Sequence, residues 1–319
     1  MNKPNTTWPA LSYMAWKDTL ATVHLWTQIV GKIRLRTMPW VNHSWHVTFH
    51  IAPDGLSTGS MPYQHGLFEI GFDFIHHRLR IATSQGARRE IPLQPMTVAD
   101  FYRTLFDTLA QLDIDVSIHD MPAELPGAIP FTEDTVHAAY DKDRVAGFWQ
   151  AMVLVYDVFT RFRTRFTGKC SPVHFFWGSF DLAVTRFSGR SAPLIQSGAP
   201  NTPTAVMQEA YSKEVSSCGF WPGNEQYPQA AFYAYAYPVP EGFATQPVKP
   251  AAAFYSKEMG EFLLNYDDVQ QAADPATTLM DFLQTTYEAA ANTANWDRQH
   301  LECDLSRYEH AYGCFRVEE

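Results

Sequence analysis

Long apolar runs and an excess of positive charge are both missing from this sequence of 319 residues. No stretch approaches the ~20 apolar residues that a helix needs to cross a bilayer. The first residues, Met1–Pro9, lack the apolar segment of a signal peptide. Lys and Arg number 24 against 34 Asp and Glu, for a formal net charge of −10, and an acidic surface repels phosphate backbones and anionic lipids. We therefore expect no membrane partner, no nucleic-acid partner and a cytoplasmic location.

Several motifs of common enzyme classes are missing as well. The sequence has no G-x-G-x-x-G, no Walker loop, no H-E-x-x-H and no EF-hand pattern. Its four cysteines form no C-x-x-C pair, and disulfide frameworks are typical of smaller secreted domains. Common dehydrogenases, P-loop kinases and zincins are therefore disfavoured, and the sequence leaves the cofactor open. A catalytic site built from distant segments would leave no such motif.

What is present is a composition with 46 % hydrophobic and 14 % aromatic residues, enough for a large core. Apolar residues at helical spacing predict four helices: 9–33, 97–113, 141–166 and 276–295. Alternating residues between turn signals predict strands within 42–93 and at 116–118, 173–187, 215–221, 230–237, 252–255 and 261–265. The chain has no β-α-β-α-β opening, so we predict an α+β fold of antiparallel meander sheets flanked by helices.

The order of these elements also bears on domain organisation. A stretch rich in proline and glycine, 121–131, separates residues 1–120 from residues 132–319. Both parts show a helix, a meander and a second helix, so a duplicated unit is one hypothesis. We expect residues 1–319 to form a single integral unit, whether or not its halves are related.

Three polar residues of the first helix are candidates for a site. His24, Gln28 and Lys32 lie at i, i+4 and i+8 and continue the apolar row of Trp16 and Leu20. A row that turns polar marks either the edge of a cavity or the emergence of the helix into solvent.

A second candidate is the segment 42–50, read as a strand. Its parity places Asn42, Ser44, His46, Thr48 and His50 on one face. His46 and His50 would then lie about 13 Å apart, too far to share one metal ion. His46 could still pair with a histidine of a neighbouring strand, and a solvated sheet face is the alternative. No metal site is assigned.

The segment 171–190 carries the densest group of polar residues between apolar runs. Gly178 within a strand pattern suggests a β-bulge, and the long apolar runs suggest a central strand buried on both faces. His174, Asp181 and Arg186 would then need partners, because an unpaired buried charge is costly. A structural ion pair would satisfy that need as well as a catalytic group.

Tyrosines at alternate positions mark the strand 230–237. Tyr233, Tyr235 and Tyr237 fall on one face, with alanines on the other. Such a face could be a stacking platform for a flat or sugar-like ligand. Tyrosines are also ordinary residues of strands.

Several of these segments together resemble a bacterial family defined by domain of unknown function 5996. The resemblance rests on segments 24–32, 42–47, 171–190, 209–212, 219–223 and 296–298, and it extends from about Trp8 to Glu302. The string from His174 to Asp181 is its most specific part. Ser44 and Lys213 depart from the family pattern, which has Trp and His there. The resemblance implies one integral module and brings no activity, substrate or cofactor.

The leading hypothesis is an enzyme acting on, or a binder of, a small polar molecule, anionic or sugar-like. His174 would be its general base or a metal ligand, Asp181 would orient His174, and Arg186 or Lys32 would contact an anion. The other ligand-binding candidates are His24, Gln28, Asn42, His46, Tyr233 and Tyr235. The alternative is a non-catalytic interaction or scaffold protein with an aromatic oligomer surface. The sequence leaves the oligomeric state open.

Overall fold

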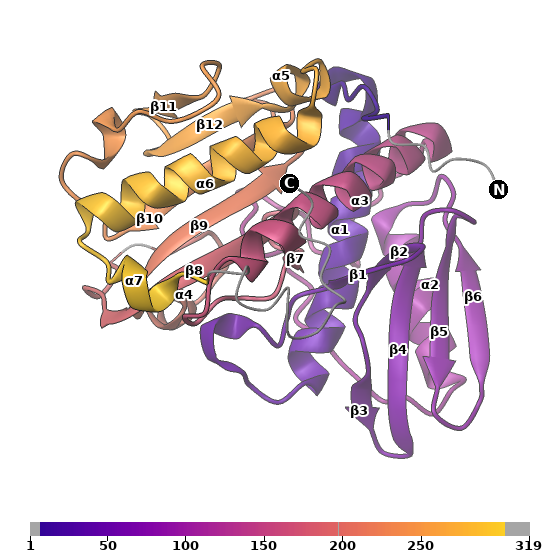
Figure 1. The fold of residues 1–319 in the computed structure, drawn as a ribbon. Coiled ribbons are helices and arrows are strands. Elements are labelled where there is room, and N and C mark those ends of the chain that lie inside the picture. Colours follow the sequence, from indigo (N-terminus) through magenta and orange to yellow (C-terminus); the bar gives the residue numbers. More distant parts are fainter. Residues whose placement is uncertain (1–6, 197, 304–319) are drawn as a thin grey trace, which may run out of the picture.

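The computed structural model describes residues 7–196 and 198–303 of the chain (Figure 1). Within them, seven α-helices accompany two antiparallel sheets of six strands each, which confirms the predicted α+β class. The α-helices are α1 (Tyr13–Thr37), α2 (Val98–Ala110), α3 (Lys142–Thr164), α4 (Thr204–Ala210), α5 (Tyr266–Gln270), α6 (Pro275–Thr293) and α7 (Arg298–Leu301). Two short 3-10 helices are η1 (Asn42–Ser44) and η2 (Phe243–Thr245).

The first sheet has the order β1-β2-β4-β5-β6, and β3 also pairs with β4. Its strands are β1 (His50–Ala52), β2 (Gly55–Ser57), β3 (Met61–Tyr63), β4 (Gly66–Asp73), β5 (Arg78–Thr83) and β6 (Arg88–Pro92). The second sheet has the order β11-β12-β10-β9-β8-β7. Its strands are β7 (His174–Phe176), β8 (Asp181–Ser191), β9 (Lys213–Trp221), β10 (Ala231–Tyr237), β11 (Phe254–Ser256) and β12 (Glu261–Asn265).

Local sequence explains most of these elements. Phe68, Ile70 and Phe72 of β4 alternate with more polar residues and are buried. The side chains of Thr97 and Asp141 accept hydrogen bonds from backbone N–H groups in the first turns of α2 and α3, as N-cap residues do. The predicted long helices are all present with shifted ends, and the first one extends to Thr37.

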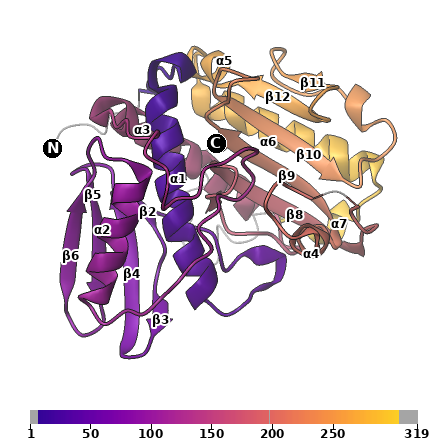
Figure 2. The same ribbon diagram turned by 180° about the vertical axis from the view of Figure 1, so that it is seen from behind.

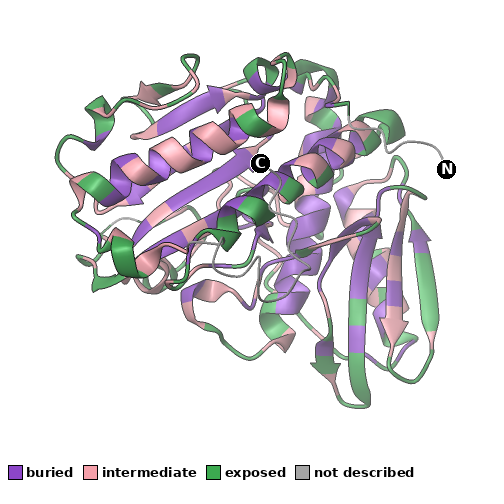
Figure 3. Ribbon diagram, in the orientation of Figure 1, coloured by how far each residue is buried: buried purple, intermediate pink, exposed green. Residues whose placement is uncertain are grey.

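Helix α1 lies between the two sheets (Figures 1 and 2) and is mostly buried (Figure 3). On one side its Trp26 stacks on Phe101 of α2, with ring centroids 4.7 Å apart. On the other side its Trp16 packs 4.8 Å from Phe148 of α3. The helix therefore serves both sheets as a shared core element.

The two sheets also meet edge to edge. The backbone N–H of Phe49 donates to the carbonyl of Phe175 at 2.9 Å, and the N–H of Phe175 donates to the carbonyl of Phe49 at 3.0 Å. These bonds form an isolated antiparallel bridge between the segment before β1 and strand β7. The bridge brings the residues around Phe49 against the residues around Phe175, and we name this contact between the two sheets the seam.

Three sequence predictions of local structure are wrong. Residues 42–49 do not form a strand, and β1 begins only at His50: Asn42–Ser44 form η1, and His43 and Ser44 both have φ 57°, which breaks the two-residue alternation. Segment 173–187 is a hairpin, with Gly178 in the turn between β7 and β8 and β7 at the sheet edge rather than in a central position. Residues 116–118 belong to no strand, and helix α4 was not foreseen.

Within the described residues, no helix is long and apolar enough to cross a membrane.

Candidate functional site

The candidate site lies on one face of the second sheet. Helix α3 packs on β8, and α6 packs on β9 and β10, so one face of the sheet belongs to the core. The register places Thr185, Ser217 and Tyr235 side by side on the other face, and Ala183, Gly219 and Tyr233 form the next such row. We name this second face the polar face; it is turned toward the viewer in Figure 2.

Asp181, at the start of β8, is the most unusual residue of the polar face. Its side chain is buried, and the residue is only 6 % exposed. One carboxylate oxygen, Oδ2, accepts a hydrogen bond from the hydroxyl of Tyr233 on β10. The other, Oδ1, is buried and has no hydrogen-bond partner in the part of the chain that the structure describes. A buried carboxylate with one free oxygen is costly unless the carboxyl is protonated or a ligand binds to it.

Two further carboxylates lie near Asp181. Burial raises its pKa to about 7, the Tyr233 hydrogen bond opposes that rise, and the charge of Glu124 adds to it. Burial and the charge of Asp181 also raise the pKa of Glu261 to about 7. Burial raises the pKa of Glu124, whose Oε2 accepts a 2.8 Å hydrogen bond from Ser179. Both Asp181 and Glu261 therefore exchange protons near neutral pH.

The ring of Tyr233 reaches Asp181 across Gly219. A Cβ atom built at Gly219 would collide with the ring and hydroxyl of Tyr233. Glycine at this position on β9 therefore leaves room for the phenol. The room is needed because Gly219 lies directly opposite Tyr233 in the strand register.

Gly219→Ala is expected to push the Tyr233 ring aside and break its hydrogen bond to Asp181, because the added methyl occupies the space of the phenol. We expect a loss of stability of about 1–3 kcal/mol, measured by urea unfolding. Tyr233→Phe removes the same hydrogen bond without steric strain and is the matched control. Equal stability of Gly219→Ala and wild type would show that the Tyr233 ring is not fixed over Gly219.

The other tyrosines of the polar face contact the chain itself. The hydroxyls of Tyr235 and Tyr211 lie 2.8 Å apart, and the hydroxyl of Tyr237 donates to the carbonyl of Pro193 at 2.9 Å. Tyr233 and Tyr235 are stacked, with centroids 6.1 Å apart and planes at 17°. Tyr211 and Pro193 therefore contact two of the three tyrosines, and all three tyrosines are half-buried.

His174 of β7 lies on the polar face, directly opposite Ala183, with Asp181 in the diagonal position. Diagonal positions across an antiparallel pair are ~7–8 Å apart. His174 is 2 % exposed, and its Nδ1 has no hydrogen-bond partner within the described residues. The nearest rings are those of Trp45, His50 and Phe176, at 6.2, 5.8 and 6.0 Å. His174 and Asp181 thus share a face, with no hydrogen bond between their side chains among the described residues.

His24 and Gln28 fix the segments that carry the carboxylates. The Nε2 atom of His24 lies 3.1 and 2.9 Å from the carbonyl oxygens of Trp177 and Gly178, in the β7–β8 turn. Burial lowers the pKa of His24 to about 4, so the ring is neutral. The amide of Gln28 donates to the carbonyl of Ala123 and accepts from its N–H, at 2.9 and 2.8 Å. The two residues therefore hold Ser179 and Glu124 in place.

The remaining candidates of the first segments are placed separately. Lys32 is buried, and burial lowers its pKa against the attraction of Asp120. Asn42 begins η1 and is half-buried. His46 is buried, and its Nδ1 accepts a 3.2 Å hydrogen bond from the N–H of Val41. None of the three contacts Asp181 directly within the described part of the chain.

Arg186 lies on the opposite face of the second sheet from Asp181. It is 1 % exposed, and its guanidinium carbon is 3.6 Å from the ring centroid of Phe162 and 4.3 Å from that of Tyr287. Nη2 donates to the carbonyl of Phe162, while Nε and Nη1 have no partner in the described ranges. Arg186 is thus part of the core beneath α3 and α6, away from the polar face.

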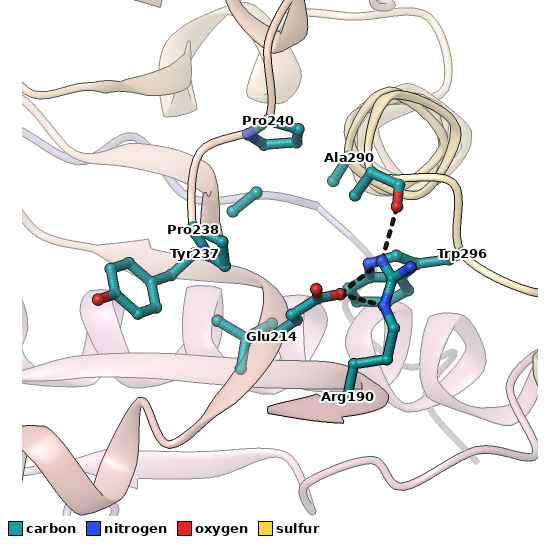
Figure 4. Close-up of a pocket in the computed structure, with 10 residues that line it drawn as sticks. Arg190, Glu214, Tyr237, Pro238, Pro240, Ala290 and Trp296 are labelled. Carbon is teal, nitrogen blue, oxygen red and sulfur yellow. Dashed lines mark hydrogen bonds and ion pairs between the residues drawn. The ribbon is translucent and has the colours of Figure 1, made fainter. Parts of the chain in front are cut away.

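A cavity of about 250 Å³ opens at the far end of β9 and β10, beside α6 (Figure 4). Arg190 and Glu214 in its wall form a 2.7 Å ion pair, and Arg190 also donates to the carbonyl of Ala294 at 2.6 Å. Its charged groups already satisfy each other, so the cavity offers no free charge to a ligand.

The part of the chain that the structure describes shows neither a cluster of metal ligands nor a disulfide. Residues 7–196 and 198–303 contain no group of three His, Cys, Asp or Glu side chains that could hold a metal ion. Cys170, Cys218 and Cys303 are free thiols; Cys314 lies outside the described residues.

Sequence reasoning missed four residues that matter here: Arg34, Glu124, Tyr211 and Glu261. It also passed over the segment Gly55–Gly59, which has the G-x-S-x-G spacing of a nucleophile elbow. This segment is not an elbow, because Ser57 ends an antiparallel strand, no helix follows directly, and its hydroxyl donates to Glu69 at 2.7 Å.

The architecture and its carboxylate–tyrosine cluster define a compact α+β protein with a buried titratable site. The chain belongs to the family of unknown function DUF5996, whose sequence profile matches residues 8–303. No curated protein and no solved structure showed significant similarity to it.

Proposed function

We propose that the protein is an enzyme that acts on a small polar molecule by general acid–base chemistry at the polar face. The observation that carries the proposal is Asp181: a buried carboxyl with one oxygen fixed by Tyr233 and the other without a partner. A group with a pKa of about 7 is present in both protonation states at neutral pH, as a general acid or base must be.

The other groups have supporting roles. Tyr233 holds the carboxyl of Asp181 in one orientation, and its own pKa is raised well above 10 by burial first and then by Asp181, so it remains a donor. Glu261 and Glu124 keep the region negative when ionised, which disfavours an anion beside Asp181. A hydroxyl or amino group of the substrate suits this position, where Asp181 Oδ1 accepts its proton. Tyr235 adds an aromatic ring beside Tyr233.

Asp181→Asn is expected to slow the reaction at least about 100-fold, the usual contribution of a general acid–base group. The assay incubates a mixture of small hydroxylated and amino metabolites with the protein and follows each mass by chromatography and mass spectrometry. Asp157→Asn is the matched control, because Asp157 pairs with Arg161 on an exposed part of α3.

Two results would contradict the proposal. One is the absence of any consumed metabolite with wild-type protein across the mixture. The other is a metabolite that Asp181→Asn and wild type consume at the same rate.

A further inference from the structure

The seam between the two sheets gathers three basic side chains beside the polar face. The backbone bridge between Phe49 and Phe175 continues the ladder so that His50 and His174 lie opposite each other. Their ring centroids are 5.8 Å apart. Arg34, in the last turn of α1, reaches the same place, and its Nη2 lies 3.5 Å from Nε2 of His50.

Arg34 is a buried cation without a counterion. The residue is 5 % exposed, and within the described residues no carboxylate lies within 4.0 Å of its guanidinium. Nη1 donates to the carbonyl of Thr58, and Nε has no partner. Burial lowers the pKa of Arg34 only to about 10, so the group stays charged at neutral pH. An uncompensated buried charge is strongly destabilising unless an anion neutralises it.

The two histidines add neutral donors. Burial, followed by the charges of His50 and Arg34, lowers the pKa of His174 to about 3. Burial, followed by Arg34, lowers the pKa of His50, against the attraction of Glu69. A neutral imidazole carries one N–H donor, and Nδ1 of His174 has no partner among residues 7–196 and 198–303.

The nearby carboxylates are engaged elsewhere. Glu69 accepts a 2.7 Å hydrogen bond from Ser57, and Glu209 accepts one of 2.7 Å from the N–H of His43. Gly59, with φ +60°, leaves space beside these groups because it has no side chain. A Cβ atom at this position would lie 3.4 Å from the His50 ring and 3.9 Å from Nη1 of Arg34.

We propose that Arg34, His50 and His174 form a subsite for the carboxylate group of the substrate. This inference names the substrate class of the function proposed above and rests on it. Arg34 is the ion partner, and His174 is a neutral hydrogen-bond donor. Asp181 lies one diagonal position from His174 on the same sheet face, so the substrate is a hydroxy or amino acid a few carbons long, its carboxylate at Arg34 and its hydroxyl or amino group at Asp181.

A carboxylate suits this subsite better than a phosphate group. Arg34 supplies one positive charge, and both histidines are neutral near pH 7. One guanidinium balances the single charge of a carboxylate, whereas phosphate carries between one and two negative charges and would leave part of its charge buried and unpaired.

The test measures melting temperature in sodium acetate or sodium lactate, against sodium chloride at equal ionic strength, neutral acetamide and sodium phosphate. We expect saturable stabilisation of wild type by about 2 °C or more with the carboxylates alone. We expect no such shift for Arg34→Gln. Stabilisation by phosphate in place of acetate and lactate, or no stabilisation by either carboxylate, would overturn the proposal.

A second variant keeps the test decisive if Arg34→Gln does not fold. His50→Glu places a carboxylate beside Arg34, so we expect a higher melting temperature than wild type in chloride and no further shift with acetate. His65→Glu makes the same charge change in the exposed β3–β4 turn and should keep the acetate response. An acetate response that survives in His50→Glu would contradict the subsite.

The two proposals fail separately. Asp181→Asn should keep the acetate response, because acetate reaches only Arg34 and the histidines. Acetate binding without any Asp181-dependent conversion would refute the acid–base function alone, and conversion without carboxylate binding would refute the subsite alone.

Discussion

Asp181→Asn is expected to be more stable than wild type at pH 8, by about 1–3 kcal/mol, and to show a flatter dependence of stability on pH. Burial is the main reason that the pKa of Asp181 is raised from 3.8 to about 7, and Glu124 adds to it. The folded protein therefore holds this proton more tightly than the unfolded chain does. The resulting stabilisation is complete below pH 3.8 and is lost as pH rises to about 7, by ~1.4 kcal/mol for each pH unit.

Asparagine cannot ionise, so the variant lacks this loss. Its amide places N–H donors where Oδ1 of Asp181 has no partner, which costs about 1–3 kcal/mol at every pH. The variant should accordingly be no more stable than wild type near pH ~4, and the two stability curves should cross between about pH 4.5 and pH 6. Urea unfolding at pH values from about 4 to 8 measures the crossing.

Asp73 is a control for this prediction, because its pKa is shifted in the opposite direction to that of Asp181. Although burial raises its pKa, hydrogen bonds from His76 and Arg78 outweigh burial and lower it below 3.8. Its contribution is present above the unfolded-state pKa and is lost only as pH falls through the lowered pKa. Asp73→Asn should therefore destabilise the protein by a nearly constant amount between about pH 5 and pH 8. Parallel curves for wild type and Asp181→Asn would contradict the assignment of a raised pKa to Asp181.

The fold could be predicted where the determining pattern is local. Alternation along β4 and β10, and helical spacing along α2, α3 and α6, are visible in the sequence. In a regular strand or helix the buried side chains lie on one face and therefore recur at the period of that element. The same logic failed for residues 42–50. There His43 and Ser44 adopt left-handed backbone angles, and Glu209, 166 residues away, accepts a hydrogen bond from the N–H of His43. A bond over that distance leaves no trace in the local pattern.

The site could be predicted only in part for the same reason. His174, Asp181 and Tyr233 stood out as polar residues in apolar surroundings, and all three lie on the polar face. Which strand pairs with which, and in what register, decides that Tyr233 meets Asp181 across Gly219. Arg34 and Glu261 looked like ordinary charged residues near the ends of a helix and a strand. Their importance follows from burial, which the sequence does not report.

Arg186 is a buried cation of the core, whereas Arg34 is the cation proposed to bind a ligand. Two substitutions of Arg186, to alanine and to methionine, should therefore differ strongly in their effect on stability. Arg186→Ala leaves an empty space among Phe162, Phe166 and Tyr287, and we expect a loss of about 2–5 kcal/mol. Arg186→Met fills most of that space with apolar atoms and removes two buried guanidinium nitrogens, Nε and Nη1, that have no partner among the described residues.

The methionine variant loses a contact between guanidinium and aromatic rings, about 2 kcal/mol when desolvated, and the hydrogen bond to the carbonyl of Phe162. The variant also no longer buries a charge without a counterion, and the free energy gained in this way is of similar or larger size than the free energy lost. We therefore expect Arg186→Met to lie within about 1 kcal/mol of wild type in urea unfolding, and to keep the acetate response that Arg34→Gln loses. A loss in Arg186→Met as large as that in Arg186→Ala would show that the charge itself holds the core together. A missing acetate response in a stable Arg186→Met would move the anion site from the seam to the opposite face of the sheet.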